Sequence, residues 1–300
     1  MPGKTTRMPQ PKFFQDTIAI VYDFDGTLSP QPMQEYTVLP KIGVDAKAFW
    51  ARVNQEYEET GSDSMLVYMR LMLREANARE VSIKREDFAT LAKSIEYFPG
   101  VETWFTRMNT YVKKRSAGKV KVQHYIISAG QKEILEGVSI RKHFKQIYAS
   151  EYHFDHNGVA DFPKVLINDT TKTQFLFRVN KGREILNQSI NEHMPEHQRP
   201  IPFSHMIYIG DGMSDVPSMA LTKKNGGHTI AVHDPRKKSG KDQCISLMRA
   251  KRVDFIAPAD YTKGSKLEAR VELVLDSIIT DIAYEKEVFD CKLEHRLIDS

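Results

Sequence analysis

A short apolar run, residues 18–22, ends directly on two acidic residues, Asp23 and Asp25, with Gly26 and Thr27 next in the chain. Such a run fits a buried strand, so both carboxylates are expected at the edge of a sheet. Two acids this close together are hard to keep ionised unless a cation lies between them, and Mg2+ prefers oxygen ligands of this kind. The spacing also permits two tasks, with Asp23 attacking an electrophile and Asp25 exchanging a proton with the leaving group.

Short apolar segments alternate with segments of helical periodicity along most of the chain. Further strands are predicted at 120–127, 146–154, 206–209, 228–232 and 253–256, with 165–168 as a possible partner of 146–154. Helices are predicted near 101–114, 182–191 and 266–287, and residues 192–205 form a loop rich in proline and histidine whose spacing fits no zinc site. This alternation predicts an α/β fold with a Rossmann-like, doubly wound parallel sheet.

The first predicted strand is followed by helical spacing instead of a second strand. Apolar residues share one face over 46–57 and over 65–76, Ser62 and Asp63 suit the start of the second helix, and a third helix is predicted over 82–96. The sequence therefore predicts a mainly helical cap domain, residues 31–97, inserted into a core of residues 13–30 and 98–300. Residues 1–12 are basic and contain proline, which predicts a flexible tail.

Composition and charge exclude several classes of protein. Of 300 residues, 41% are hydrophobic and 27% charged, and no apolar run approaches the roughly 20 residues that span a bilayer. The two cysteines, Cys244 and Cys291, give no disulfide framework, and without a secretory signal a cytoplasmic location is expected. The net charge is only +4, and the basic clusters at 113–115 and 236–238 lack interleaved aromatic residues, so we expect neither a nucleic-acid nor a membrane partner.

Two more predicted strands end on polar residues. Ser128, with Gly130 nearby, either caps a helix or holds a phosphate through its hydroxyl and adjacent backbone N–H groups. Two glycines flank Asp211, and Asp215 lies four positions later, which places both carboxylates on one side of a helix start. Lys181 resembles an ordinary solvated lysine, but it would supply the fixed cation that an anionic substrate needs. Ligands of parallel sheets bind beyond the carboxyl ends of the strands, so one shared site is expected.

In this order, the motifs resemble those of the haloacid dehalogenase superfamily. Asp23-Phe-Asp25-Gly-Thr27 resembles the first motif, Ser128 the second, Lys181 the third, and Gly210-Asp211-Gly212-Met-Ser-Asp215 the fourth. The long interval between the first two motifs is similar to that of members with an inserted helical cap, and the phosphoserine phosphatase-like branch is the nearest in shape.

The resemblance also implies a role for each motif residue. A Mg2+ ion would be held by Asp23, the backbone carbonyl of Asp25 and Asp211, with Asp215 in support. The phosphate would be held by Ser128 and Lys181, with Thr27 ordering the loop or contacting the phosphate.

The acid at Asp25 narrows the implied activity. Dehalogenases lack an acid at this position, since a halide leaves without a proton, and the related ion-pumping ATPases have threonine there. The resemblance therefore implies a phosphatase, which hydrolyses a small-molecule phosphomonoester through an aspartyl-phosphate on Asp23. A phosphotransferase or sugar-phosphate mutase would use the same nucleophile, and a phosphate- or RNA-binding protein on a retired enzyme core would keep the fold.

The segment after the first motif bears on the substrate. Phosphoserine phosphatases have a glutamate seven positions after the second aspartate, where this chain has Pro32, so phosphoserine is not the expected substrate. Gln34, Glu35 and Tyr36 lie where the predicted cap meets the core, and they either recognise the leaving group or form hinge surface. The sequence indicates no oligomeric state.

Overall fold

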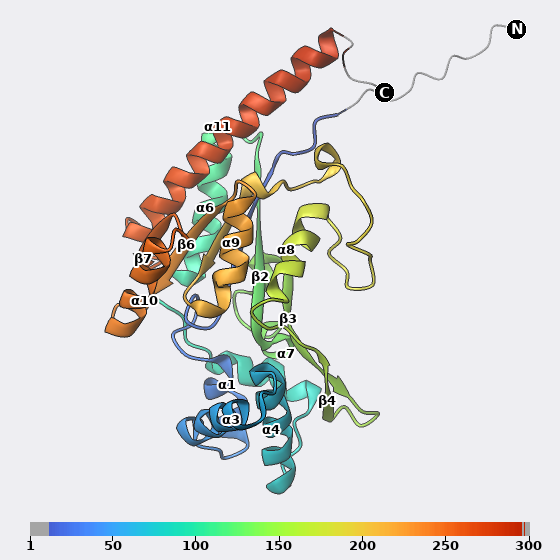
Figure 1. Cartoon of the computed structure of the whole chain (residues 1–300), viewed down its shortest axis with the longest axis vertical. Coiled ribbons are helices and arrows are strands. Elements are labelled where there is room, and N and C mark those ends of the chain that lie inside the picture. Colours follow the sequence, from blue (N-terminus) through green and yellow to red (C-terminus); the bar gives the residue numbers. More distant parts are fainter. Residues whose placement is uncertain (1–11, 296, 298–300) are drawn as a thin grey trace, which may run out of the picture.

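A seven-stranded sheet forms the centre of the molecule (Figure 1). The structure, a computed structural model, describes residues 12–295 and 297. The strands lie in the order β4-β3-β2-β1-β5-β6-β7, and every neighbouring pair is parallel except β3 and β4. Their bounds are β1 (Thr17–Tyr22), β2 (Lys121–Gln131), β3 (Phe144–Phe154), β4 (Ala160–Val165), β5 (Met206–Gly210), β6 (His228–His233) and β7 (Phe255–Pro258). The predicted α/β fold with a doubly wound parallel sheet is confirmed.

Helices cover both faces of this sheet (Figure 1). Alternate residues of β1 enter two separate apolar clusters, Ile18 and Ile20 on one face and Ala19 and Val21 on the other. Helices α6 and α11 pack on the first face and α8 on the second. The α-helices are α1 (Met33–Tyr36), α2 (Val38–Lys41), α3 (Ala46–Thr60), α4 (Ser64–Ala78), α5 (Phe88–Leu91), α6 (Val101–Arg115), α7 (Lys132–Leu135), α8 (Lys172–Lys181), α9 (Val216–Lys224), α10 (Lys238–Arg249) and α11 (Lys266–Glu294).

Helices α1 to α5 lie beyond the carboxyl ends of the central strands, and the long β3–β4 ribbon reaches toward them (Figure 1). Asp63 caps the N-terminus of α4, because its side chain accepts hydrogen bonds from the backbone N–H groups of Met65 and Leu66. The ribbon is tied to the same helix, since the hydroxyl of Tyr152 on β3 donates to the carbonyl of Met69 at 2.9 Å. The edge of the sheet where a ligand would bind therefore faces these helices.

The prediction of a helix over 182–191 is wrong. Helix α8 occupies the preceding residues and ends where Gly182 adopts a left-handed conformation with φ of 62°. The guanidinium of Arg178 then holds the following chain as a loop, donating to the backbone carbonyls of Arg183, Ile185, Leu186 and Gln188. These bonds satisfy carbonyl groups that a helix would have paired internally.

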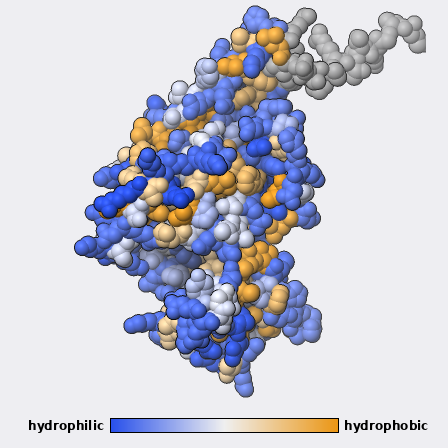
Figure 2. All heavy atoms as spheres, viewed as in Figure 1, coloured by the Kyte–Doolittle hydropathy of each residue, from blue (hydrophilic) through white to orange (hydrophobic). Residues whose placement is uncertain are grey.

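Other boundaries also differ from the predictions. The helix predicted over 82–96 is broken into α5 and two 3-10 turns, Arg85–Asp87 and Ala92–Ser94. The partner of β3 is β4 at Ala160–Val165 rather than 165–168, and α11 continues to Glu294. The predicted tail, residues 1–12, lies outside the described residues except for Lys12. None of the described helices is long and apolar enough to cross a membrane. Figure 2 shows hydrophilic residues over most of the visible face, with smaller hydrophobic areas between them.

Candidate active site

The carboxyl ends of β1 and β5 bring the first and last acidic motifs together. Asp23 follows β1 directly, and its backbone N–H donates to the carbonyl of Ile209 on β5 at 2.9 Å. Asp211 follows the last residue of β5, and the turn after it carries Asp215. Adjacent parallel strands thus deliver three carboxylates to one point, as the strand-end pattern predicted.

A buried lysine holds two of these carboxylates. The Nζ atom of Lys172 lies 3.0 Å from Oδ1 of Asp23 and 2.8 Å from Oδ1 of Asp215. The side chain of Lys172 is 1% exposed, and the hydroxyl of Tyr208 donates a further hydrogen bond to Asp215 at 2.7 Å. Charges this deeply buried persist only with close partners of opposite sign, so these residues form one electrostatic unit.

The structure does not bring Lys181 to this site. Lys181 is the last residue of α8, and its Nζ donates to the carbonyls of Ile190 at 2.6 Å and Glu192 at 2.8 Å. Lys172 is the first residue of the same helix, roughly 14 Å away along the helix axis. The prediction that Lys181 belongs to the site is therefore corrected, and the lysine beside the carboxylates is Lys172.

The sequence around Lys172 carries a signal for a buried lysine. Lys172, Phe175, Leu176 and Val179 are spaced i, i+3, i+4 and i+7, which places them on one face of a helix. All four are buried in the structure. A lysine at the start of an otherwise apolar face indicates a buried charge with a partner. Tyr208 has no such signal in the sequence, because the role of its hydroxyl depends on Asp215 lying beside it in the fold.

Two glycines allow the acidic groups to approach the backbone closely. A Cβ atom on Gly26 would lie 2.1 Å from Oδ2 of Asp211, and the φ of Gly26 is +77°. A Cβ atom on Gly210 would lie 2.2 Å from Oδ2 of Asp215. That same oxygen accepts hydrogen bonds from the backbone N–H groups of Asp211 and Gly212. Larger residues at either glycine would push the carboxylates apart.

The site carries more negative charge than its lysine can balance. Burial raises the pKa of Asp23 to about 6, with Asp215 adding to the rise and Lys172 opposing it. Burial and the charge of Asp23 also raise the pKa of Asp25, and burial together with Asp215 raises that of Asp211. Burial disfavours the ammonium of Lys172, yet Asp215 and Asp23 raise its pKa above the ordinary value. The arrangement therefore favours an additional cation.

The donor atoms suit a hard divalent cation. Carboxylate oxygens of Asp23, Asp211 and Asp215 all lie within 4.8 Å of one another. Oxygen-only donor sets of this kind match Mg2+ rather than zinc. Asp215 already accepts hydrogen bonds from Lys172, Tyr208 and two backbone N–H groups. Asp23 and Asp211 are thus freer to bind a metal than Asp215.

The phosphate side of the predicted site is linked to Asp25 through Met33. The backbone N–H of Met33 donates to Oδ1 of Asp25 at 2.9 Å, and the Met33 side chain packs on Gly130, where a Cβ would lie 2.1 Å from its Cε. The Oγ atom of Ser128 accepts from the N–H of Gly130 at 3.0 Å, and Ser128 is buried. Thr27 is fully buried, and its Oγ1 has no hydrogen-bond partner in the described part of the chain. That hydroxyl is available to a ligand.

The three candidate specificity residues have different surroundings. Gln34 is 2% exposed, and its Oε1 has no partner among residues 12–295 and 297. The carboxylate of Glu35 accepts from the indole N–H of Trp50 on α3 at 2.8 Å. The carbonyl of Tyr36 accepts from the hydroxyl of Ser94. Glu35 is thereby held toward α3, whereas Gln34, which follows Met33 in the chain, keeps an unpaired buried oxygen within the described residues.

Replacing Lys172 is expected to destabilise the fold strongly. Lys172→Met leaves two buried carboxylates without their cation, which corresponds to a loss of about 3–5 kcal/mol in the free energy of unfolding. Lys181→Met is the matched control, and it should lose less than about 1.5 kcal/mol because Lys181 only donates to two carbonyls near the surface. Urea unfolding in EDTA measures both values, and equal losses would contradict this assignment.

Known proteins share both the sequence pattern and the fold. The family model described as haloacid dehalogenase-like hydrolase matches residues 20–220. An uncharacterized protein of Borreliella burgdorferi is 27% identical over 277 residues, which covers 84% of this chain and 94% of that protein.

Two solved structures resemble the fold at low sequence identity. One is a phospho-aspartyl intermediate analogue of phosphoserine phosphatase, 16% identical, with a TM-score of 0.53 and 86% of this chain and 99% of that chain covered. The other is a haloacid dehalogenase family hydrolase of Salmonella enterica serovar Typhi, 18% identical, with a TM-score of 0.53 and 83% and 68% covered. With the family model spanning more than half of its residues, the chain belongs to the haloacid dehalogenase-like hydrolase family.

Proposed function

We propose that the protein is a Mg2+-dependent phosphatase that hydrolyses a small-molecule phosphomonoester through an aspartyl-phosphate on Asp23. The observation that carries this proposal is the buried Lys172, whose ammonium lies 3.0 Å from Asp23 and 2.8 Å from Asp215. A nucleophilic carboxylate fixed beside a cation, with a second acid two residues later, is the arrangement that phosphoryl transfer requires. Membership of a hydrolase family supports the same reaction class.

The acidic cluster would hold the metal. Asp23 and Asp211 would supply carboxylate oxygens, and the backbone carbonyl of Asp25 would be a further donor, as the family resemblance implies. Asp215 would support them, because it holds Lys172 and accepts from the backbone N–H of Asp211. A bound Mg2+ would offset the repulsion between these carboxylates and a phosphate dianion.

In the first step, a carboxylate oxygen of Asp23 attacks phosphorus while the bond from phosphorus to the ester oxygen breaks. Asp25 would carry out the proton transfer, and the hydrogen bond from the N–H of Met33 to its Oδ1 supports this role by fixing the carboxyl group. Asp25 gives its proton to the departing oxygen, which leaves as an alcohol. Lys172, Ser128 and the Thr27 hydroxyl stabilise the charge on the phosphoryl oxygens.

In the second step, water replaces the alcohol. Asp25, now a carboxylate, takes a proton from the water molecule while the water oxygen attacks phosphorus. The bond between phosphorus and Asp23 breaks, so that phosphate is released and both acids return to their starting states. Residues 31–97 act as the cap in this proposal, since α1 to α4 lie beyond the carboxyl ends of the strands and would exclude bulk water (Figure 1).

Phosphate release tests the function directly. The purified protein is expected to release phosphate from members of a panel of sugar phosphates, nucleotides and phospho-amino acids, with activity lost in EDTA and restored by Mg2+. Asp23→Asn should reduce the rate to background, because the amide is a poor nucleophile. Glu58→Asn, on the exposed surface of α3, is the control and should keep full activity. Turnover by Asp23→Asn near the wild-type rate would overturn the assignment.

Substrates with different leaving groups test the general-acid role of Asp25. Asp25→Asn is expected to slow hydrolysis of alkyl phosphates by about 10²- to 10⁴-fold, since their alkoxide needs a proton. The first step with p-nitrophenyl phosphate should be affected far less, because nitrophenolate leaves without one. Single-turnover release of nitrophenol and of an alkyl alcohol separates the two cases. Equal losses for both substrates would contradict the general-acid role.

We further propose that Gln34 contacts the leaving group. Its side chain is buried, its Oε1 lacks a partner within the described residues, and it follows Met33, which holds the proton-donating Asp25. A buried amide without a partner is costly, so a ligand that pairs with it gains affinity. Glu35 is a weaker candidate because Trp50 already occupies its carboxylate.

A substitution at Gln34 should change KM selectively. Gln34→Leu is expected to raise KM for the best substrate of the panel by roughly tenfold, as loss of one buried hydrogen bond would. Hydrolysis of p-nitrophenyl phosphate, whose leaving group differs, should change little. Gln31→Leu, at an exposed position three residues earlier, is the matched control. If the KM for both substrates rises equally, Gln34 has a structural role instead.

A further inference from the structure

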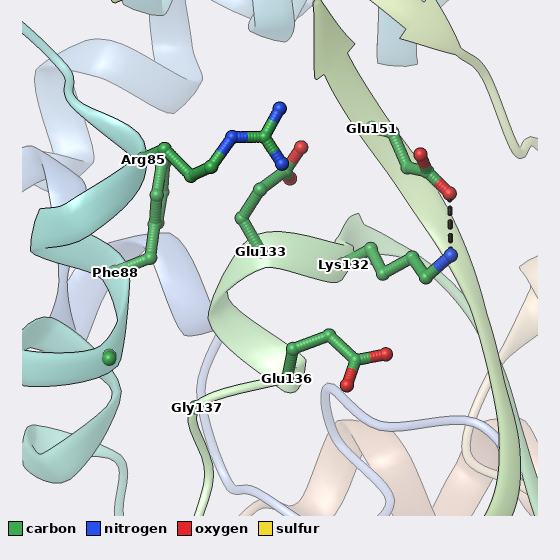
Figure 3. A pocket seen from close by; sticks show the side chains of 8 residues that line it. Arg85, Phe88, Lys132, Glu133, Glu136, Gly137 and Glu151 are labelled. Carbon is green, nitrogen blue, oxygen red and sulfur yellow. Dashed lines mark hydrogen bonds and ion pairs between the residues drawn. The ribbon is translucent and has the colours of Figure 1, made fainter. Parts of the chain in front are cut away.

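A cavity whose lining includes none of the clustered aspartates lies between the helical segment, residues 31–97, and the core (Figure 3). Its volume is about 330 Å³. Arg85 and Phe88 form one wall and belong to the segment between β1 and α6. The opposite wall comes from Lys132 and Glu133 on α7 and from Glu151 on β3. Binding pockets for small molecules occupy about 300–1,000 Å³, so this cavity suits a small ligand.

Most charges around the cavity are already paired within the protein. The Nζ of Lys132 lies 2.7 Å from Oε1 of Glu151, and the other oxygen of Glu151 lies 3.2 Å from Nζ of Lys164. Glu136, at the rim, pairs with Arg141. These pairs need no ligand.

Arg85 and Glu133 are the two exceptions. The guanidinium of Arg85 lies 4.3 Å from the ring centre of Phe154, and no ion pair joins it to a carboxylate among the described residues. One oxygen of Glu133 accepts from the N–H of Tyr152 at 2.8 Å, while the other, Oε2, is buried and has no partner in residues 12–295 and 297. Figure 3 shows both side chains extending into the same space. Burial raises the pKa of Glu133 to about 7, and the nearby charge of Arg85 opposes this rise.

The charge pattern selects the kind of ligand. A simple anion drawn to Arg85 would meet Glu133, Glu136 and Glu151, and a simple cation drawn to Glu133 would meet Arg85 and Lys132. A molecule that carries both charges close together satisfies both unpaired groups. Phe88 and the nearby Ala89 add apolar surface to the wall formed by Arg85.

We propose that this cavity binds a small zwitterion of the α-amino acid type, with its carboxylate on Arg85, its ammonium group on Glu133, and its side chain against Phe88. The ligand would bridge the helical segment and α7, which begins four residues after Ser128. Its occupancy would therefore stabilise the arrangement of these two parts of the chain.

Calorimetric titration of the full-length protein tests this site. The probes are the 20 common amino acids, followed for the best binder by the amine without its carboxylate, the acid without its ammonium group, and inorganic phosphate. At least one amino acid is expected to bind with a Kd below about 1 mM. The amine and the acid should each bind at least tenfold more weakly. Equal binding of either fragment, of phosphate, or no binding at all would overturn the proposal.

Substitutions locate the binding site. Arg85→Gln and Glu133→Gln are each expected to raise Kd by tenfold or more. Arg74→Gln, at an exposed position on α4 outside the cavity, is the control and should leave Kd unchanged. Arg85 is exposed, so its substitution should not impair folding, and thermal unfolding of each variant checks this. If Asp211→Asn abolishes binding and Arg85→Gln does not, the amino acid occupies the catalytic site and the proposal fails.

Discussion

The buried contact of Lys172 with Asp23 and Asp215 is the interaction on which the rest of the site depends. It joins the start of α8 to the end of β1 and to the turn after β5. An ammonium group that is 1% exposed loses nearly all its hydration, so both carboxylates must stay close to it. Their positions are thus fixed by charge before any substrate arrives. Enzymes use such fixed charges to stabilise a transition state, because the charged groups need not reorient during the reaction.

The neighbouring backbone is arranged to tolerate this concentration of charge. Gly26 and Gly210 each leave room for a carboxylate that a Cβ atom would displace, and two backbone N–H groups donate to Asp215. Asp215 is therefore satisfied by the protein itself, whereas Asp23 and Asp211 keep oxygens for other partners. Asp211 and Asp215, four positions apart, therefore differ in how many of their oxygens the protein already occupies.

The sequence predicted the parts of this arrangement that have a local signature. A strand that ends on acidic residues is visible in a few consecutive positions, so Asp23 and Asp211 could be placed at one edge of the sheet. The partners of a buried lysine lie far away in sequence, so local pattern does not distinguish Lys172 from Lys181 at the other end of the same helix. The prediction of a helix over 182–191 was wrong for a similar reason. The side chain of Arg178 holds this segment as a loop by hydrogen bonds to its backbone carbonyls, and hydrophobic periodicity does not reveal such bonds.

Lys172 also connects the site to the helical segment, residues 31–97. Asn168 accepts the N–H of Lys172 through its backbone carbonyl at 3.0 Å, and its side-chain amide donates to Oδ2 of Asp63 at 2.8 Å. Asp63 caps the N-terminus of α4, and the hydroxyl of Tyr68 on that helix donates to the carbonyl of Ala129, next to Ser128. One helix therefore touches the segment that carries the buried cation and the segment that carries the predicted phosphate-binding serine. Movement of α4 away from the core would break both contacts, so the position of α4 is physically coupled to the segments that carry Lys172 and Ser128.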